Sequence, residues 1–529
     1  MKIWLILALL FAAVPASAAD IYVAQSSAGG NTGADCADAR AVSSLASGDW
    51  TAGNTIHLCG TITSAITAQG SGSSGSVITV KFESGASMQM PAIPSTGGIV
   101  LNTRSYILID GGGGSCGWVS YADVTCSQGA ILSTANGTGQ ANQVASIAIY
   151  APNSANIEVK GLLIGPLYTH TSTSDLVLSP PGALCAYFSG GSHWKIHNNT
   201  LHDASWCISG GSATGDVQVY NDEIYNIDHG LGMGGPNNAI VIHDNHIHDF
   251  ANWDTTNNSF HHDGIHIWGT TGSANTNAQE YNNLIDGDPG ANWTADIYNE
   301  GLDTGFLMYN NVALVSAAGR KSCCGIMDFW GNGYTGDHNS AYNNTVIGVY
   351  VAGTGSCFGI ETNTNVTFEN NTLYGCQGMI GWDAGSSIIT VDYNAYEDVG
   401  TDHGIGAAAN TFGYPSPAPQ SASFTTWKTN CSCDAHSQFG TTSQFAQNSN
   451  GTFRSGSFLS GNGTNLSSLS ITPLDSDTQG TSRPGGSTAW DIGAFSGASA
   501  PSAPSNLQII ILGEKGDTHG TPSIAQLGR

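Results

Sequence analysis

The chain has 529 residues, with 39 Asp and Glu against 13 Lys and Arg, and its formal net charge is −26. This acidity argues against binding to nucleic acid, because neutralising phosphates requires clustered basic side chains. Apolar residues make up 40% of the chain and 70 residues are glycine, which fits a folded all-β protein with many short strands and turns, and not a disordered chain.

The first 18 residues predict a secretory signal peptide. Lys2 is followed by an apolar run that ends in Ala16-Ser17-Ala18, an A-x-A cleavage pattern. No later segment offers about 18 uninterrupted apolar residues, so no membrane span is expected. The sequence therefore predicts an extracellular protein, and we expect it to be a monomer.

Twelve cysteines in an exported chain indicate disulfides. A zinc site is the rival interpretation, but no CxxC pair occurs. The partners of Cys323, Cys324, Cys431 and Cys433 stay open. Four other combinations lie close in sequence: Cys36 with Cys59, Cys116 with Cys126, Cys185 with Cys207, and Cys357 with Cys376.

A short motif with two adjacent Asn or Asp residues recurs through the middle of the chain, at steps of 23 to 38 residues. A minimum step near 23 with occasional insertions predicts a stacked β coil, in which each strand pairs with its equivalent about 4.8 Å away. The paired residues fall at the bends, where Asn tolerates the left-handed conformation and can bond to the Asn above and below. The second residues of the motif are Asn199, Asp222, Asn245, Asn283, Asn311, Asn344, Asn371 and Asn394.

A second strand recurs between these bends, and its alternation predicts which side chains face outward. Aligning the apolar centres predicts a core stack of Ile208, Leu231, Ile265, Ile297, Ile326, Ile360 and Ile380. The outward neighbours would then be Gly232, His266, Tyr298, Met327, Glu361 and Gly381, preceded by Gly230, Gly264, Asp296, Gly325 and Gly359. Glycines bordered by aromatic and charged side chains predict a groove floor against which sugar rings can stack. The candidate substrate-binding residues are Trp268, Tyr298, Trp330 and Glu361.

The repeat resembles the right-handed parallel β-helix of the pectate-lyase-like superfamily, as do the opening segments IYVAQSSAGGN and AGNTIHLCGTIT. The resemblance implies a β-helix over residues 19–412 and a closing segment over 413–498, with strands at FTTWK (424–428) and WDIGAF (490–495). GYPSPAPQ (413–420) would link the two parts, and residues 499–529 would form a Pro/Ser-rich tail.

The stretch HHDGIHI resembles a motif of the polygalacturonase family, Asn-Thr-Asp-Gly-x-Asp, which presents its aspartate to the cleft. Asp263 matches that aspartate, and His266 stands where the second one would be. HGLGMGG, which contains His229, resembles the Gly-His-Gly stretch of the family but precedes the aspartate motif. No Asp-Asp-Cys copy exists, and Asp296 is the nearest counterpart, so the chain departs from that family's pattern.

The leading hypothesis is a glycoside hydrolase that uses two carboxyl groups, one protonated and one ionised. Asp263 would pair with Asp296 or Glu300, because adjacent coils place such groups about 5 to 7 Å apart. A neighbouring histidine would orient or tune them; the candidates are His229, His262 and His266. The structural alternative is that these side chains cap strands and bind backbone amides.

Three alternatives remain open. A polysaccharide lyase would need a base and a cation, for which the chain offers Lys195, Arg320 and Lys321, with Ca²⁺ in an acidic groove. A non-catalytic β-helix would bind glycans or partners without turnover. Two outward ladders could bind metal or simply stack; they are His197, Tyr220, His243 and Tyr281, and His202, Tyr225 and His248.

Overall fold

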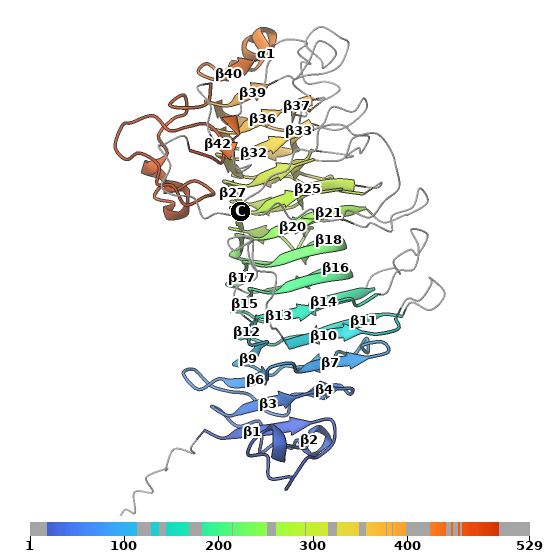
Figure 1. The fold of residues 1–529 in the computed structure, drawn as a ribbon. Coiled ribbons are helices and arrows are strands. Elements are labelled where there is room, and N and C mark those ends of the chain that lie inside the picture. Colours follow the sequence, from blue (N-terminus) through green and yellow to red (C-terminus); the bar gives the residue numbers. More distant parts are fainter. Residues whose placement is uncertain are drawn as a thin grey trace, which may run out of the picture.

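The protein is a long stack of β coils that runs from β1 at one end to β39 and β40 at the other (Figure 1). The computed structural model describes residues 18–113, 129–136, 144–168, 182–213, 215–250, 261–290, 293–315, 325–348, 356–376, 378–382, 385–397, 424–440, 446–447, 453–454 and 458–496. The signal peptide over residues 1–17, the link 413–420 and the tail 499–529 lie outside these residues.

Two long sheets form the walls of the stack, and each strand pairs in parallel with its equivalent in the next coil, as β17 does with β15 and β19. The predicted right-handed parallel β-helix is thereby confirmed. The first sheet has 14 strands, in the order β2 (Arg40–Ala41), β1 (Asp20–Ala24), β3 (Thr55–Cys59), β6 (Ile78–Phe82), β9 (Ile107–Asp110), β12 (Ile157–Lys160), β15 (Trp194–His197), β17 (Val217–Tyr220), β19 (Ile240–His243), β23 (Gln279–Tyr281), β27 (Leu307–Tyr309), β31 (Ser340–Tyr342), β35 (Val366–Glu369) and β38 (Ile388–Asp392).

The second sheet has 22 strands and carries the predicted groove. Its strands are β4 (Thr61–Ile62), β5 (Ile66–Thr67), β7 (Ser87–Met90), β8 (Ile99–Val100), β10 (Gly129–Ser133), β11 (Ser146–Tyr150), β13 (Leu162–Ile164), β14 (Ala183–Tyr187), β16 (Thr200–Gly211), β18 (Glu223–Gly234), β20 (His246–His248), β21 (His262–Gly269), β24 (Leu284–Asp286), β25 (Trp293–Gly301), β28 (Val312–Leu314), β29 (Met327–Trp330), β32 (Thr345–Ile347), β33 (Ser356–Glu361), β36 (Thr372–Tyr374), β37 (Gly378–Trp382), β39 (Ala395–Glu397) and β40 (Gln438–Gly440).

Two smaller sheets and one helix complete the described elements. A four-stranded sheet contains β22 (Asn275–Thr276), β26 (Asp303–Thr304), β30 (Gly336–Asp337) and β34 (Asn363–Thr364). The strands β41 (Ala446–Gln447) and β42 (Phe453–Arg454) pair antiparallel. The helix is α1 (Phe424–Cys431), and short 3-10 turns occur at Cys36–Asp38, Val42–Ser44, Ser467–Leu469 and Thr472–Asp475.

The predicted ladder of Asn side chains runs through the interior of the bends. Its members are fully buried, and Asn283 shows the pattern: its Nδ2 donates to the backbone oxygen of Ile242 and to Oδ1 of Asn311, both at 3.0 Å. The preceding residue of each pair has a positive φ, for example 54° at Asn282, as a tight bend between strands requires. Each rung therefore satisfies buried backbone groups of the coil next to it, which fixes the spacing of the stack.

The core stack follows the prediction for four coils and then departs from it. Ile208, Leu231, Ile265 and Ile297 lie in register across β16, β18, β21 and β25. The next members are Met327, Phe358 and Ile380. The predicted alignment of Ile326 and Ile360 with this row was wrong, and so was the outward position of Met327, which is 0% exposed.

A local irregularity explains the slip. The carbonyl oxygen of Ile326 accepts hydrogen bonds from the amides of both Asp296 and Ile297. Two residues of β25 therefore oppose one residue of the next coil, and the inward–outward alternation of side chains shifts by one residue. Asp328 consequently takes the outward position opposite Tyr298, and Gly359 follows it in the next coil.

The row at Gly230 and Gly264 faces inward, contrary to the prediction. A Cβ built on Gly264 would lie 3.2 Å from the side chain of Ile285, which is itself part of the core. Asp296 occupies the position opposite Gly264 in β25 and is only 2% exposed. Inward-facing glycines at this corner let the backbones of successive coils approach closely, so they belong to packing and not to the groove floor.

The predicted strand at residues 424–428 was also wrong, because this segment is the helix α1. Only Trp427 among Phe424–Thr429 is fully buried, which matches one face of a helix and not the alternation of a strand. Its ring packs edge-on against Trp382, and its Nε1 donates to Asp434 at 2.6 Å. Residues 490–495 form no described strand; they lie against the coils, where Nδ2 of Asn343 donates to the carbonyl oxygen of Gly493 at 3.0 Å.

Candidate functional site

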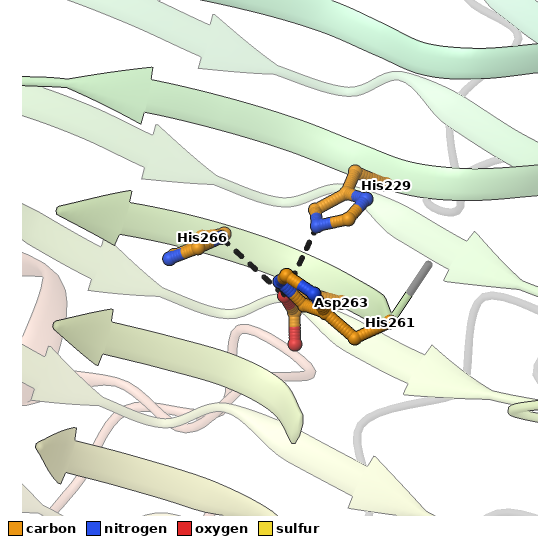
Figure 2. Close-up of side chains that lie close together, drawn as sticks. All are labelled: His229, His261, Asp263 and His266. Carbon is orange, nitrogen blue, oxygen red and sulfur yellow. Dashed lines mark ion pairs between the residues drawn. The ribbon is translucent and has the colours of Figure 1, made fainter. Parts of the chain in front are cut away.

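The site is built around one aspartate carboxylate on the outer face of β18 and β21. His229 stands opposite Asp263 in the register of the two strands. The Nε2 atoms of His229 and His261 lie 3.2 and 3.3 Å from Oδ2 of Asp263, and Nδ1 of His266 lies 3.4 Å from the same oxygen. Figure 2 shows the three rings converging on this carboxylate from two neighbouring coils.

A bulge in β21 produces this convergence. The pairing with β25 shifts between His262 and Asp263, and the next two residues, Gly264 and Ile265, both turn toward the interior. Side chains at His261, Asp263 and His266 therefore emerge together, although strict alternation would separate the last from the other two.

Because of the bulge, the ring of His262 points away from the cluster and lies next to Asp228. His262 is 0% exposed, and its Nδ1 lies 3.3 Å from Oδ1 of Asp228. Its neighbour His261, which the sequence analysis did not select, has a side chain 49% exposed and forms the solvent side of the cluster. The i and i+2 spacing of His261 and Asp263 was the signal that could have identified it.

Burial and neighbouring charges shift the pKa values of Asp263 and His229 in opposite directions. Burial favours the neutral acid at Asp263, but the neighbouring imidazoles of His229, His266 and His261 outweigh this effect and lower the pKa of its carboxyl. Burial likewise favours neutral His229, yet Asp228 and Asp263 raise the pKa of that ring to about 9. The backbone amide of Ala295 donates to Oδ1 of Asp263 at 3.1 Å. Oδ1 of Asp263 thus accepts a backbone hydrogen bond, whereas Oδ2 faces the three imidazole nitrogens, and the residue is 0% exposed.

Two further carboxylates contact the ring nitrogens of His266 and His229 that do not face Asp263. Nε2 of His266 lies 2.9 Å from Oε2 of Glu300, whose other oxygen accepts from the side-chain amide of Asn332. Nδ1 of His229 lies 3.4 Å from Oδ2 of Asp228. Burial acts to raise the pKa of Glu300, but the bond with His266, the charge of that ring and the bond with Asn332 together outweigh it, so the pKa is lowered and Glu300 is ionised at neutral pH.

Aromatic rings flank the cluster along the same face. Trp206 stacks on His229 with ring centroids 4.2 Å apart and meets Trp268 edge-on at 5.6 Å. A Cβ at Gly232 would lie 2.5 Å from the Trp206 ring, so only glycine lets the indole lie flat there. In the next coils Tyr298 and Trp330 have centroids 6.4 Å apart. Trp268, Glu300, Trp330 and Glu361 follow one another in register, whereas the prediction had placed Glu361 in the row of Tyr298.

Two other carboxyl groups differ from Glu300 in their protonation. Burial raises the pKa of Asp296 well above its ordinary value and that of Asp328 to about 8. Asp296 belongs to the inward row, whereas Asp328 belongs to the outward row, where the amide of Gly325 donates to its Oδ2 at 2.6 Å. The sequence analysis missed Asp328 because it placed Met327 at this position.

The lyase candidates do not join the cluster in the described part of the chain. Lys195 lies in β15, which belongs to the first sheet, whereas the cluster lies on the second. Arg320 and Lys321 fall outside the described residues. None of the described Lys and Arg residues lies on β16, β18, β21, β25, β29 or β33.

The two predicted aromatic ladders do stack. Tyr220 lies between His197 and His243, with ring centroids 4.5 and 4.9 Å away, and Tyr281 continues the column. A second column consists of His202, Tyr225 and His248. These columns run across the strands from coil to coil and stabilise the stacking of the solenoid.

A metal ion could be held at two places among the described residues. The donor atoms of His229, His261, Asp263 and His266 all lie within 4.8 Å of one another. Those of Glu223, His246 and His248 do so as well. In this second set each histidine already has a closer carboxylate, since His246 Nε2 is 2.8 Å from Asp286 and His248 Nδ1 is 2.9 Å from Asp249.

Comparison with known proteins gives resemblances of architecture. No protein family model and no curated protein matches the chain. Among solved structures, the chain is similar to the GH136 lacto-N-biosidase from Eubacterium ramulus, at 11% identity over 70% of this chain and 65% of that one, with a TM-score of 0.39. It therefore spans just under two thirds of that enzyme's length. At these levels of similarity the comparison carries no inference about function.

Two further structures show the same degree of similarity. Pectate lyase Pel9A is 14% identical over 90% of this chain and 96% of its own length, with a TM-score of 0.39. The Family 28 exopolygalacturonase of Yersinia enterocolitica is 13% identical over 68% of this chain and 74% of its own, with a TM-score of 0.38.

The described cysteines form four disulfides. The predicted pairs Cys36–Cys59, Cys185–Cys207 and Cys357–Cys376 are confirmed, and Cys431 pairs with Cys433. Cys116, Cys126, Cys323 and Cys324 lie outside the described residues. Four disulfides are typical of a protein that folds in an oxidising compartment. Among the described helices, none has the length and apolar character needed to cross a bilayer.

Proposed function

We propose that the protein is an exported enzyme that hydrolyses glycosidic bonds of a polysaccharide lying across β18, β21, β25 and β29. One observation carries the proposal: Glu300, an ionised carboxylate on the solvent side, stands in a row of aromatic side chains and is oriented by His266 and Asn332. Aromatic faces bind sugar rings, and a fixed ionised carboxylate is what the reaction requires as base or nucleophile.

The roles follow from burial and protonation. Glu300 is the group that we assign to contact with substrate, because its side chain is 20% exposed and its pKa is lowered. Asp263 is fully buried, with Oδ1 bonded to the amide of Ala295 and Oδ2 facing the imidazole nitrogens, so we assign it as a positioning residue that acts through His266. This assignment changes the leading hypothesis, in which Asp263 itself acted on the sugar.

A hydrolase also needs a protonated group. Asp328 matches the protonation that this role requires, since its pKa of about 8 keeps it protonated at neutral pH and its Oδ1 has no hydrogen-bond partner. Its side chain is 0% exposed, so proton donation to the sugar requires the side chain to rotate toward the groove. Glu300 is opposite Trp330, so Asp328 lies one strand away and two residues along, a diagonal of about 7 to 8 Å between backbones. We propose an inverting hydrolase on this basis, because the carboxyl groups of such enzymes stand about 6.5 to 9.5 Å apart, a spacing that side chains on this diagonal can span.

The test is a panel of neutral and uronate polysaccharides, assayed for new reducing ends and for the absorbance of unsaturated uronates. A hydrolase produces reducing ends without the absorbance, whereas a lyase produces both. Glu300→Gln should lower kcat on the cleaved substrate at least about 100-fold, in line with loss of a general acid or base. Glu369→Gln, on the opposite sheet, is the matched control and should retain activity.

Two results would overturn the proposal: absorbance appearing with cleavage, or an unchanged kcat in Glu300→Gln. Because Asp263 is assigned to positioning, Asp263→Asn should shift the pH profile of kcat in addition to lowering it. A uniform loss of rate at every pH would leave it a merely structural role.

A further inference from the structure

We propose that His229, His261, Asp263 and His266 form a binding site for one divalent transition-metal ion, best matched by Zn²⁺. The inference rests on the geometry of these four side chains and not on the proposed hydrolysis of polysaccharide. The sequence suggested metal for the cysteines, the acidic groove and the aromatic ladders, but not for these four side chains.

The distances fit a metal shell. In a tetrahedral zinc site with bonds of about 2.0 to 2.1 Å, neighbouring donor atoms lie about 3.3 to 3.4 Å apart. Oδ2 of Asp263 lies 3.2, 3.3 and 3.4 Å from the three imidazole nitrogens. All four donor atoms lie within 4.8 Å of one another, so a single ion can reach each of them after small side-chain movements.

The second observation is a set of buried polar atoms that lack hydrogen bonds. Nε2 of His229, Nδ1 of His266 and Oδ2 of Asp263 are each closed off from solvent and outside hydrogen-bonding geometry with any group of the described chain. Their residues are 1%, 5% and 0% exposed. Leaving such groups unsatisfied is costly, because they have lost their hydrogen bonds to water and gained none within the protein. Coordination to one cation would satisfy all three at once.

The surroundings match those of known metal-binding histidines in protein chemistry. A ligating imidazole usually donates its second nitrogen to a carboxylate, which orients the ring and raises its basicity. His266 has Glu300 at 2.9 Å from its Nε2, and His229 has Asp228 at 3.4 Å from its Nδ1. The remaining nitrogens, Nδ1 of His266 and Nε2 of His229, face Asp263, so both rings present a donor atom to the same point.

The donor types select the class of ion. Three imidazoles and one carboxylate suit zinc and the neighbouring transition metals, whereas Ca²⁺ and Mg²⁺ prefer all-oxygen shells. Four protein donors fill a tetrahedral shell, so the ion would join β18 to β21 and hold His266 against Glu300. The Glu223, His246 and His248 set lacks this match, because it offers three donor residues only, and the contact between Glu223 and His248 is 3.7 Å long.

The experiment measures metal on the purified mature protein. After dialysis against EDTA, the protein is titrated with ZnCl₂ by calorimetry, and bound zinc is counted by mass spectrometry. Co²⁺ added to the same protein reports geometry through the intense visible bands of a tetrahedral complex. We expect one tightly bound equivalent. His261→Ala is the primary variant, because its half-exposed ring can be removed with little effect on folding.

Matched variants separate the site from its surroundings. His261→Ala and Asp263→Asn should lose the equivalent, and Glu300→Gln should weaken binding about 10 to 100-fold, as loss of a supporting carboxylate does. His248→Ala, in the other cluster, should keep it. Absence of a stoichiometric equivalent in the wild type, or its retention in both His261→Ala and Asp263→Asn, would overturn the inference. Zinc binding without cleavage of any polysaccharide would refute only the proposed hydrolase, and cleavage without zinc binding would refute only the metal site.

Discussion

Asp222 interrupts a ladder that is otherwise made of asparagine, and replacing it with Asn should stabilise the protein in a pH-dependent way. Its Oδ1 accepts from the backbone and side chain of Asn199, but its Oδ2 has no hydrogen-bond partner. At the equivalent position Asn245 uses its amide to donate to the carbonyl oxygen of Val219 and to Asn283. The substitution Asp222→Asn would supply the missing donor.

The magnitude follows from protonation. Burial raises the pKa of Asp222 from 3.8 to about 8 in the folded protein. A raised carboxyl pKa means that the folded state holds a proton which the unfolded state releases, so stability falls as pH rises from about 4 to about 8. One pKa unit is worth about 1.36 kcal/mol, so the wild type loses about 4 kcal/mol at pH 7 but only about 0.5 kcal/mol at pH 4.

The assay is urea denaturation of the wild type and Asp222→Asn between pH 4 and pH 8, followed by tryptophan fluorescence. The two proteins should unfold at similar urea concentrations at pH 4, and the variant should become progressively more resistant toward pH 8. Asp216→Asn is the control, because the Asp216 side chain is 48% exposed and its charge costs little. A difference that is the same at every pH, or a variant less stable at pH 7, would refute this account of the ladder.

Two further predictions concern the packing around the site. Gly232→Ala should destabilise the protein by about 1 to 3 kcal/mol and displace Trp206 from its stack on His229, because the new methyl group would lie 2.5 Å from the indole. The control Gly215→Ala has open space around it and should leave stability unchanged. Equal urea midpoints for the two variants would contradict this prediction. Replacing both Cys185 and Cys207 with Ala should lower the free energy of unfolding by about 3 kcal/mol, because their disulfide closes a loop of about 22 residues. Removing the Cys431–Cys433 disulfide, whose cysteines are only two residues apart, should cost less than half as much. A larger loss of stability at the short loop in the same denaturation assay would contradict the loop-closure argument.

The fold could be predicted from the sequence because its signal is repeated many times. Each Asn pair marks the same bend, and misreading one copy would not have changed the period. The ladder from Asn199 to Asn394 and the stacked rings of Tyr220 and His243 were therefore predicted correctly.

The backbone irregularities at Ile326 and His262 each affect one coil, so no other copy of the repeat reveals them. The double acceptor at the carbonyl of Ile326 moved the alternation by one residue, which hid Asp328. The bulge after His262 exchanged the roles of two adjacent histidines, so the sequence analysis selected His262 where the structure presents His261. Such shifts arise from backbone hydrogen bonds between coils, and the alternation of residue types does not record them.

The helix α1 shows a different limit. Its residues Phe424–Lys428 contain aromatic and β-branched side chains that are typical of strands, yet the burial of Trp427 against Trp382 and Asp434 decides the local conformation. Tertiary contacts of this kind are invisible to a reading of local propensity.

The central claim is that β18 and β21 bring four donor atoms to one point. A crystal of the mature protein grown with zinc chloride, with diffraction recorded on both sides of the zinc absorption edge, tests this claim most directly. We expect one strong anomalous peak about 2.0 to 2.2 Å from Nε2 of His229, Nε2 of His261, Oδ2 of Asp263 and Nδ1 of His266. No peak at this position, or rings that point away from Asp263, would contradict it.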